Sequence, residues 1–192
     1  NIQKESTLNL QIKGNLCERL AGYSLSLDGD IGVNFYLELA ENVISDDSAH
    51  MQFTLPNGDI QKIAVEDTKM TELNDKTYYI FKCNVAATEM TDAIKAQIIT
   101  DTDMGEEYSY SVKEYADYLL AHTGDNAEYA KAEPLVRAML NYGAYAQIFK
   151  GHNAENLPCE PSDVSNYVIS EHGFSAAALA YDGEGLALVE VQ

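Results

Sequence analysis

Apolar and polar residues alternate in short runs from residue 6 to residue 110, and turn residues separate the runs. In one run Val33, Phe35 and Leu37 share a side, and polar residues occupy the other. A period of two is typical of a β-strand that buries one face. The first strand is expected at 8–12, and the runs together predict about seven or eight strands. We therefore expect an antiparallel sheet that closes as a sandwich.

Two segments with apolar residues at helical spacing follow the strands. Ser111 and Glu114 have the spacing of a capping box, so a helix is predicted over 112–122. A second helix is predicted over 127–149, and Pro134 should either restart it or kink it. Because their connection is short, the two helices should pack as an antiparallel pair. The apolar stripe of the second helix is expected to be Leu135, Val136, Met139, Tyr142, Gly143 and Ala146.

These patterns predict an α+β fold: an antiparallel β-sandwich-like sheet with an antiparallel helix pair, plus a C-terminal β-hairpin. Residues 1–150 should form the β-rich module with its helical pair. Pro158 and Pro161 lie in a polar stretch, 151–163, which predicts a linker or a long loop. Residues 164–192 are strand-like and either complete the first domain or begin a second β unit.

Acidic residues outnumber basic ones by 31 to 12, which gives a net charge of −19. Such a charge repels phosphate backbones, so we expect no nucleic-acid partner. The acids are scattered, which favours solubility in an extracellular setting over a dedicated site for a cation or a basic partner. No apolar run approaches the roughly 20 residues that cross a bilayer, so no membrane insertion is expected. The chain begins at Asn1 without an initiator Met and is expected to be an interior fragment.

The three cysteines are an odd number without metal-like spacing. Cys83 alternates with Phe81 and Val85, so it is expected to be a buried small hydrophobe. For Cys17 and Cys159, the sequence leaves open either a disulfide between them or two free thiols.

Familiar motifs of catalytic and nucleotide-binding sites do not occur in the chain. We therefore expect neither an enzyme nor a cofactor. The alternative is a carbohydrate hydrolase, which would need two carboxylates at a set separation in a cleft.

Asp101, Asp103 and Glu106 surround a glycine turn and form a candidate calcium site. Calcium is a hard cation that takes six to eight oxygen ligands. The segment departs from the EF-hand pattern, because Gly105 stands where a third acid is needed. Lesser candidates are the pairs Asp28/Asp30 and Asp46/Asp47. The alternative interpretation is that all of these are solvated turn acids.

Aromatic residues are the other candidate for binding, because the chain has 13 Tyr and no Trp. Exposed tyrosines stack on sugars or anchor a protein partner. Tyr36 and Tyr78 fall on the polar sides of their strands, and Tyr118 and Tyr145 fall at the edges of the helical stripes. The alternative is that these tyrosines pack against the rest of the module.

Four strings of the chain have a familiar pattern: AGYSLSLDGDIGVNFY (21–36), MQFT (51–54), YSYSVKEYADY (108–118) and AMLNYGAYAQ (138–147). Over about residues 20–150 they resemble a module of large multidomain cell-surface proteins from gut-dwelling Gram-positive clostridia. The last two strings are the most specific, and residues 152–192 match less well. The resemblance implies an exported setting, a β module with two helices, and no catalytic residues. Adhesins, glycan-associated factors and immunoglobulin binders carry modules of this kind.

Together, the residues and the resemblance predict a non-catalytic binding module at the bacterial cell surface or in a secreted protein. We expect it to recognise a host macromolecule, with immunoglobulin ahead of a glycan, as a monomeric part of a multidomain chain. The alternatives are a carbohydrate-binding module or accessory domain of a glycan-active enzyme, and a structural stalk domain.

Overall fold

Four antiparallel strands form the first sheet of the computed structural model, which describes residues 15–27, 29–162, 177–181 and 186–190. Their order across the sheet is β1 (Cys17–Ser26), β2 (Gly32–Leu39), β6 (Lys76–Asn84) and β5 (Lys69–Leu73). The strand expected at 8–12 lies outside the described residues. β1 and β5 are therefore the two edge strands of this sheet.

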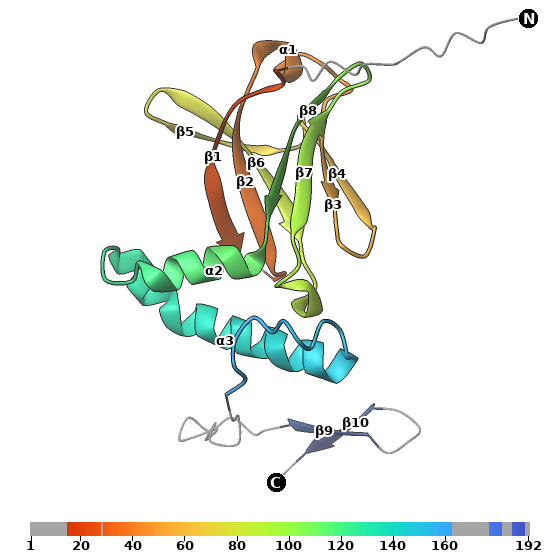
Figure 1. Ribbon diagram of the computed structural model, residues 1–192, viewed down its shortest axis with the longest axis vertical. Coiled ribbons are helices and arrows are strands. Elements are labelled where there is room, and N and C mark those ends of the chain that lie inside the picture. The colour runs from red at the N-terminus through yellow and green to blue at the C-terminus, as the bar shows by residue number, and fades with distance from the viewer. Residues whose placement is uncertain (1–14, 28, 163–176, 182–185, 191–192) are drawn as a thin grey trace, which may run out of the picture. The chain divides into compact units, whose positions relative to one another are not determined.

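The second sheet also has four antiparallel strands (Figure 1). Their order is β4 (Ile60–Ala64), β3 (His50–Thr54), β7 (Ile94–Ile99) and β8 (Met104–Tyr110). The short helix α1 (Glu41–Ile44) leads from β2 to β3, and the 3-10 turn η1 (Ala87–Glu89) leads from β6 to β7. The chain therefore crosses between the sheets at both ends.

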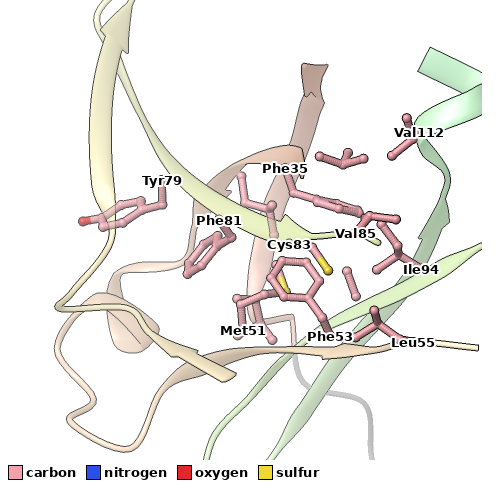
Figure 2. Packing of buried hydrophobic residues seen from close by; sticks show 14 of the residues in the cluster. Phe35, Met51, Phe53, Leu55, Tyr79, Phe81, Cys83, Val85, Ile94 and Val112 are labelled. Carbon is pink, nitrogen blue, oxygen red and sulfur yellow. The ribbon is translucent and has the colours of Figure 1, made fainter. Parts of the chain in front are cut away.

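The core lies between the two sheets. Phe35 of β2 and Phe53 of β3 are fully buried, and their ring centroids are 5.3 Å apart. Figure 2 shows Phe81 and Cys83 of β6 in the same cluster, on the side of the first sheet. The two antiparallel four-stranded sheets, together with the helices, confirm the α+β fold class. Cys83 is a buried thiol, as expected, and Cys17 and Cys159 are also free, so they form no disulfide with each other.

A pair of helices follows the last strand of the second sheet and lies at one end of the two sheets (Figure 1). α2 (Val112–Ala121) begins at the expected N-cap, because the Ser111 hydroxyl accepts a hydrogen bond from the Glu114 amide; the same hydroxyl donates one to the Glu114 carboxylate. α3 (Ala127–Lys150) continues through Pro134 without a restart.

The buried face of α3 differs from the predicted stripe. Leu135 is 58% exposed and Tyr142 is 62% exposed. The residues that α3 does bury are Val136, Met139, Leu140, Gly143, Ala144 and Gln147. The prediction was wrong at Leu135 and Tyr142 because an amphipathic pattern gives the apolar positions of a helix, whereas contacts with the neighbouring elements decide which of them are covered.

A close approach between α3 and the η1 segment sets this rotation. A Cβ atom added at Gly143 would lie 2.6 Å from the Met90 sulfur and 3.1 Å from the Ala87 carbonyl oxygen. Only glycine allows this distance without displacement of the neighbours. The fully buried Gln147 lies one turn further along the same face.

Gln147 holds the segment that follows α3. Its Nε2 lies 3.2 Å from the carbonyl oxygens of Asn153 and Asn156 and 3.5 Å from that of His152. His152 also pairs with Asp92, at 2.8 Å. Residues 151–160, expected to form a linker or long loop, contain no helix or strand and belong to the same compact unit as the sheets.

Residues 161–192 form a separate unit. Its described segments are β9 (Ala177–Tyr181) and β10 (Leu186–Glu190), which pair antiparallel. The turn at 182–185 and the strand-like run at 164–169 lie outside the described residues, so the C-terminal hairpin stays a prediction. Among the described helices of the chain, none is both long and apolar enough to cross a membrane.

Candidate functional site

Two tyrosines close one side of the sandwich. Tyr23 on β1, an edge strand of the first sheet, stacks on Tyr110 of β8, an edge strand of the second sheet. The ring centroids are 3.7 Å apart and the planes differ by 1°. Tyr23 also packs edge-on against the buried Phe35, at 5.1 Å. The stacked pair is therefore anchored in the core and reaches the surface from there.

The two helices place three more tyrosines around this pair. Tyr115 and Tyr118 come from successive turns of α2, and Tyr129 comes from the first turn of α3. Together with Gly22, Tyr23 and Tyr110 they line a hollow of about 290 Å³, which we call the tyrosine pocket. Tyr118 is 50% exposed and forms the accessible rim, whereas the other four tyrosines are less exposed.

Burial raises the pKa values of three phenols of the tyrosine pocket, those of Tyr23, Tyr110 and Tyr115. It raises the pKa of Tyr115 to about 12, with a further contribution from the neighbouring Tyr129. Burial also raises the pKa values of Tyr23 and Tyr110, and the nearby Glu114 carboxylate raises both further. Near neutral pH these three phenols are therefore uncharged, and the Glu114 carboxylate acts on two of them.

A second hollow, of about 410 Å³, adjoins the tyrosine pocket at Gly22 and Tyr23; we call it the outer groove. Tyr36 and Tyr78 line it, with Arg19 and Glu72 as its charged residues. The Tyr36 hydroxyl is hydrogen-bonded to the Ser24 hydroxyl at 3.0 Å. Because β1 has a bulge at Gly22, and a Cβ there would meet nothing within 4 Å, the backbone is open where the two hollows meet.

The structure brings together three of the four tyrosines predicted as binding residues. Tyr36 and Tyr78 line the outer groove, and Tyr118 lines the tyrosine pocket. Tyr78 was expected to be exposed but is only 7% exposed, because its strand β6 lies between β2 and β5 and its neighbours cover the ring. Tyr145, 38% exposed on α3, lines neither hollow.

Sequence reasoning missed four tyrosines of the pocket: Tyr23, Tyr110, Tyr115 and Tyr129. Tyr23 alternates with Leu25 and Leu27, and Tyr115 shares its helical spacing with Leu119, so both follow apolar patterns that predict burial. The available signal was the spacing of Tyr115 and Tyr118, which places two rings on adjacent turns at one side of a helix. Nothing in the sequence indicated that this side would meet the edge strands.

The acids proposed for calcium lie on the β7–β8 hairpin. Asp101 and Asp103 are in its turn, which the Thr100 amide closes by donating to the Asp103 carbonyl at 2.9 Å, and Glu106 is on β8. Within the described part of the chain, no group of three or more His, Cys, Asp or Glu side chains is placed to hold a metal ion. Asp28, of the lesser candidate pair Asp28/Asp30, lies outside the described residues. Calcium binding stays a prediction.

A third hollow, of about 620 Å³, lies between the β1–β2 connection and α3 and includes Leu135, Met139 and Tyr142 in its lining. One carboxylate, Asp30, lines it, and one, Glu72, lines the outer groove. The paired carboxylates that a glycosidase would need are thus not found together in the lining of these hollows. Comparison with known protein families, with curated proteins and with solved structures found no match, so the functional interpretation depends on the residues of the site themselves.

Proposed function

We propose that this chain is a non-catalytic binding module of a bacterial surface or secreted protein, and that it recognises a host macromolecule through the tyrosine pocket and the outer groove. The observation that carries the proposal is the convergence of seven of the 13 tyrosines on two adjoining hollows. These seven come from β1, β2, β6, β8, α2 and α3. Tyrosine is enriched at protein interfaces because it buries a large apolar ring and keeps a polar tip.

A host protein such as immunoglobulin is the leading partner. A protein interface needs a continuous surface with an anchoring residue near its centre. Tyr23 lines both hollows, so it joins the rings of the tyrosine pocket, Tyr118 among them, to Tyr36 of the outer groove. The resemblance to clostridial surface modules supports an exported setting and an immunoglobulin-type partner.

A glycan is the second candidate, and the shape of the site is the observation in its favour. The two hollows, of about 290 Å³ and 410 Å³, have the size of small-ligand sites. Tyrosine rings stack on sugars, and Arg19 and Glu72 would supply hydrogen bonds to hydroxyl groups. A structural stalk is the remaining alternative, and the burial of Tyr78 fits it as well as it fits binding.

Titration against immunoglobulins and against a glycan array tests the proposal. Tyr118→Ala should weaken binding at least about tenfold if Tyr118 anchors the partner. Tyr142→Ala is the matched control, because Tyr142 is also an exposed helical tyrosine but lies outside both hollows. Wild-type protein that binds no member of either panel would overturn the proposal and leave the stalk. Equal binding by both variants would move the site elsewhere.

A further inference from the structure

We propose that the tyrosine pocket binds a quaternary ammonium group. The inference names the ligand chemistry of a site whose role rests on the proposed function. Its first ground is the lining, which consists of five tyrosines and the backbone of Gly22. The face of an aromatic ring carries partial negative charge, and groups of such rings form cages for quaternary ammonium ions.

Charge complementarity is the second ground. Glu114 lies close enough to Tyr23 and Tyr110 to act electrostatically on both. Its carboxylate is held in place by the Ser111 hydroxyl, at 2.9 Å. The lining includes no lysine or arginine, and the chain as a whole carries a charge of −19. A cation is therefore favoured at the pocket both by the nearby carboxylate and by the longer-range field.

The hydrogen-bonding capacity of the pocket selects among cations and neutral ligands. A primary ammonium has three N–H donors that need acceptors when it leaves water, whereas a quaternary ammonium has none. The polar groups of the lining are the five phenol hydroxyls and the backbone of Gly22. A sugar would need several further donors and acceptors. A compact cation with an apolar surface therefore suits the lining better.

Size is consistent with this ligand class. Pockets for drug-sized ligands span about 300–1,000 Å³, and the tyrosine pocket, at about 290 Å³, lies just below this range, as suits a smaller head group. Tyr118 is 50% exposed and packs one ring face against His122, with centroids 4.2 Å apart, so the other face would cover one side of a compact head group while the stem of the ligand extends to solvent. We therefore expect recognition of the head group to dominate over recognition of the stem.

Calorimetric titration with choline is the central experiment. Its control is the uncharged carbon isostere, in which a tert-butyl group replaces the trimethylammonium group. Choline should bind at least about tenfold more tightly than the isostere, because shape and apolar area are matched and only the cation–π and charge interactions differ. Nε-trimethyl-lysine, which carries the same head on a different stem, distinguishes a methylated protein from a choline-type source. Equal affinity for choline and its isostere, or no binding of either quaternary ligand, would overturn the proposal.

Matched variants locate the site. Tyr118→Leu should weaken choline binding about tenfold, whereas Tyr118→Phe, which keeps the ring face, should change it less than about threefold. Glu114→Gln keeps the capping box and removes the charge, so choline binding should weaken while binding of the isostere stays the same. Tyr142→Leu should have no effect. An equal loss in Tyr118→Phe and Tyr118→Leu would contradict recognition by the ring face.

Binding of the macromolecule and binding of choline are measured independently, so failure of one proposal can be distinguished from failure of the other. If Tyr118→Ala abolishes binding of an immunoglobulin or glycan and choline neither binds nor competes, the proposed function stands and this inference fails. If choline binds at the pocket and no macromolecule does, the ligand class stands and the proposed function fails.

Discussion

Tyr23 and Tyr110 stack face to face, with ring centroids 3.7 Å apart, although they lie on different sheets. The contact joins β1 to β8 at one side of the sandwich and forms one wall of the tyrosine pocket. The recognition surface and the closure of the sandwich therefore share the same two rings. The interaction energy between the Tyr23 and Tyr110 rings can therefore be measured through its effect on stability.

A double-mutant cycle on this pair should show a coupling of about 0.5–1.5 kcal/mol. Tyr23→Ala and Tyr110→Ala each remove the stack, so the loss in the double variant should be smaller than the sum of the single losses. Urea unfolding of the four proteins measures it. Strict additivity would mean that the two rings are neighbours without an energetic interaction.

Gly143→Ala should destabilise the fold by about 1–3 kcal/mol. The new methyl group would meet the buried Met90 and the Ala87 carbonyl, and the backbone atom cannot move aside as a flexible side chain can. Gly124→Ala is the control, because a Cβ at Gly124 meets nothing within 4 Å. Thermal melting that ranks the two variants the other way would show that α3 does not approach η1 as closely as described.

Gln147→Leu should cost about 1–3 kcal/mol of unfolding free energy, because the carbonyl groups of His152, Asn153 and Asn156 lose their shared donor. Amide hydrogen exchange should increase most over residues 151–160. Ile148→Leu changes the adjacent, 48% exposed position and should alter stability by no more than about 0.5 kcal/mol. Unchanged exchange in Gln147→Leu would rule out the anchoring role.

Ser111→Ala should destabilise the fold by about 1 kcal/mol through loss of the helix cap, and Ser111→Thr should retain most of the stability. Because α2 carries Tyr115 and Tyr118, ligand affinity at the tyrosine pocket should fall in the alanine variant as well. Chemical unfolding and titration of the same samples test both effects. Unchanged ligand affinity in Ser111→Ala would show that the helix cap contributes to stability but not to binding.

Alkaline pH should destabilise the protein. Burial raises the pKa of Cys83 from 9.0 to about 12 and that of Tyr115 from 10.0 to about 12. A folded-state pKa above the unfolded value means that the neutral group favours folding, and this contribution is complete below the unfolded pKa. It should be lost as pH rises from about 9 towards about 12. Unfolding free energies across that range measure the slope, and the pair of substitutions Cys83→Ala and Tyr115→Phe should flatten it.

Local pattern was sufficient for strands such as β2 and β3 and for the start of α2, whereas the exposed strand β5 (Lys69–Leu73) has no apolar alternation and was not predicted. Phe35 and Phe53 alternate with polar neighbours, and each turned out to face the core between the sheets. The Ser111–Glu114 capping box also marked the helix start, because the interaction spans three residues. Features of this range depend on backbone period and short-range hydrogen bonds, which a single sequence contains.

The candidate site was predicted less well. Tyr36 and Tyr78 were selected for the polar sides of their strands and Tyr118 for the edge of a helical stripe, and the structure places all three at the two adjoining hollows. Tyr145, selected like Tyr118 at a stripe edge, lies elsewhere. Tyr23 and Tyr115 follow an apolar pattern, which hid their part in the pocket, because a residue at the margin of a buried face is partly covered and partly accessible.

By itself, the sequence determined that the protein is built of antiparallel strands followed by two helices, that it is strongly acidic, and that tyrosine is its prominent aromatic residue. Tertiary structure decided which strands became edges, how α3 turned around Gly143, and which five rings met. The physical reason is range: periodicity and capping act over a few residues, whereas the tyrosine pocket joins Gly22 to Tyr129 through contacts between elements that are distant in the chain.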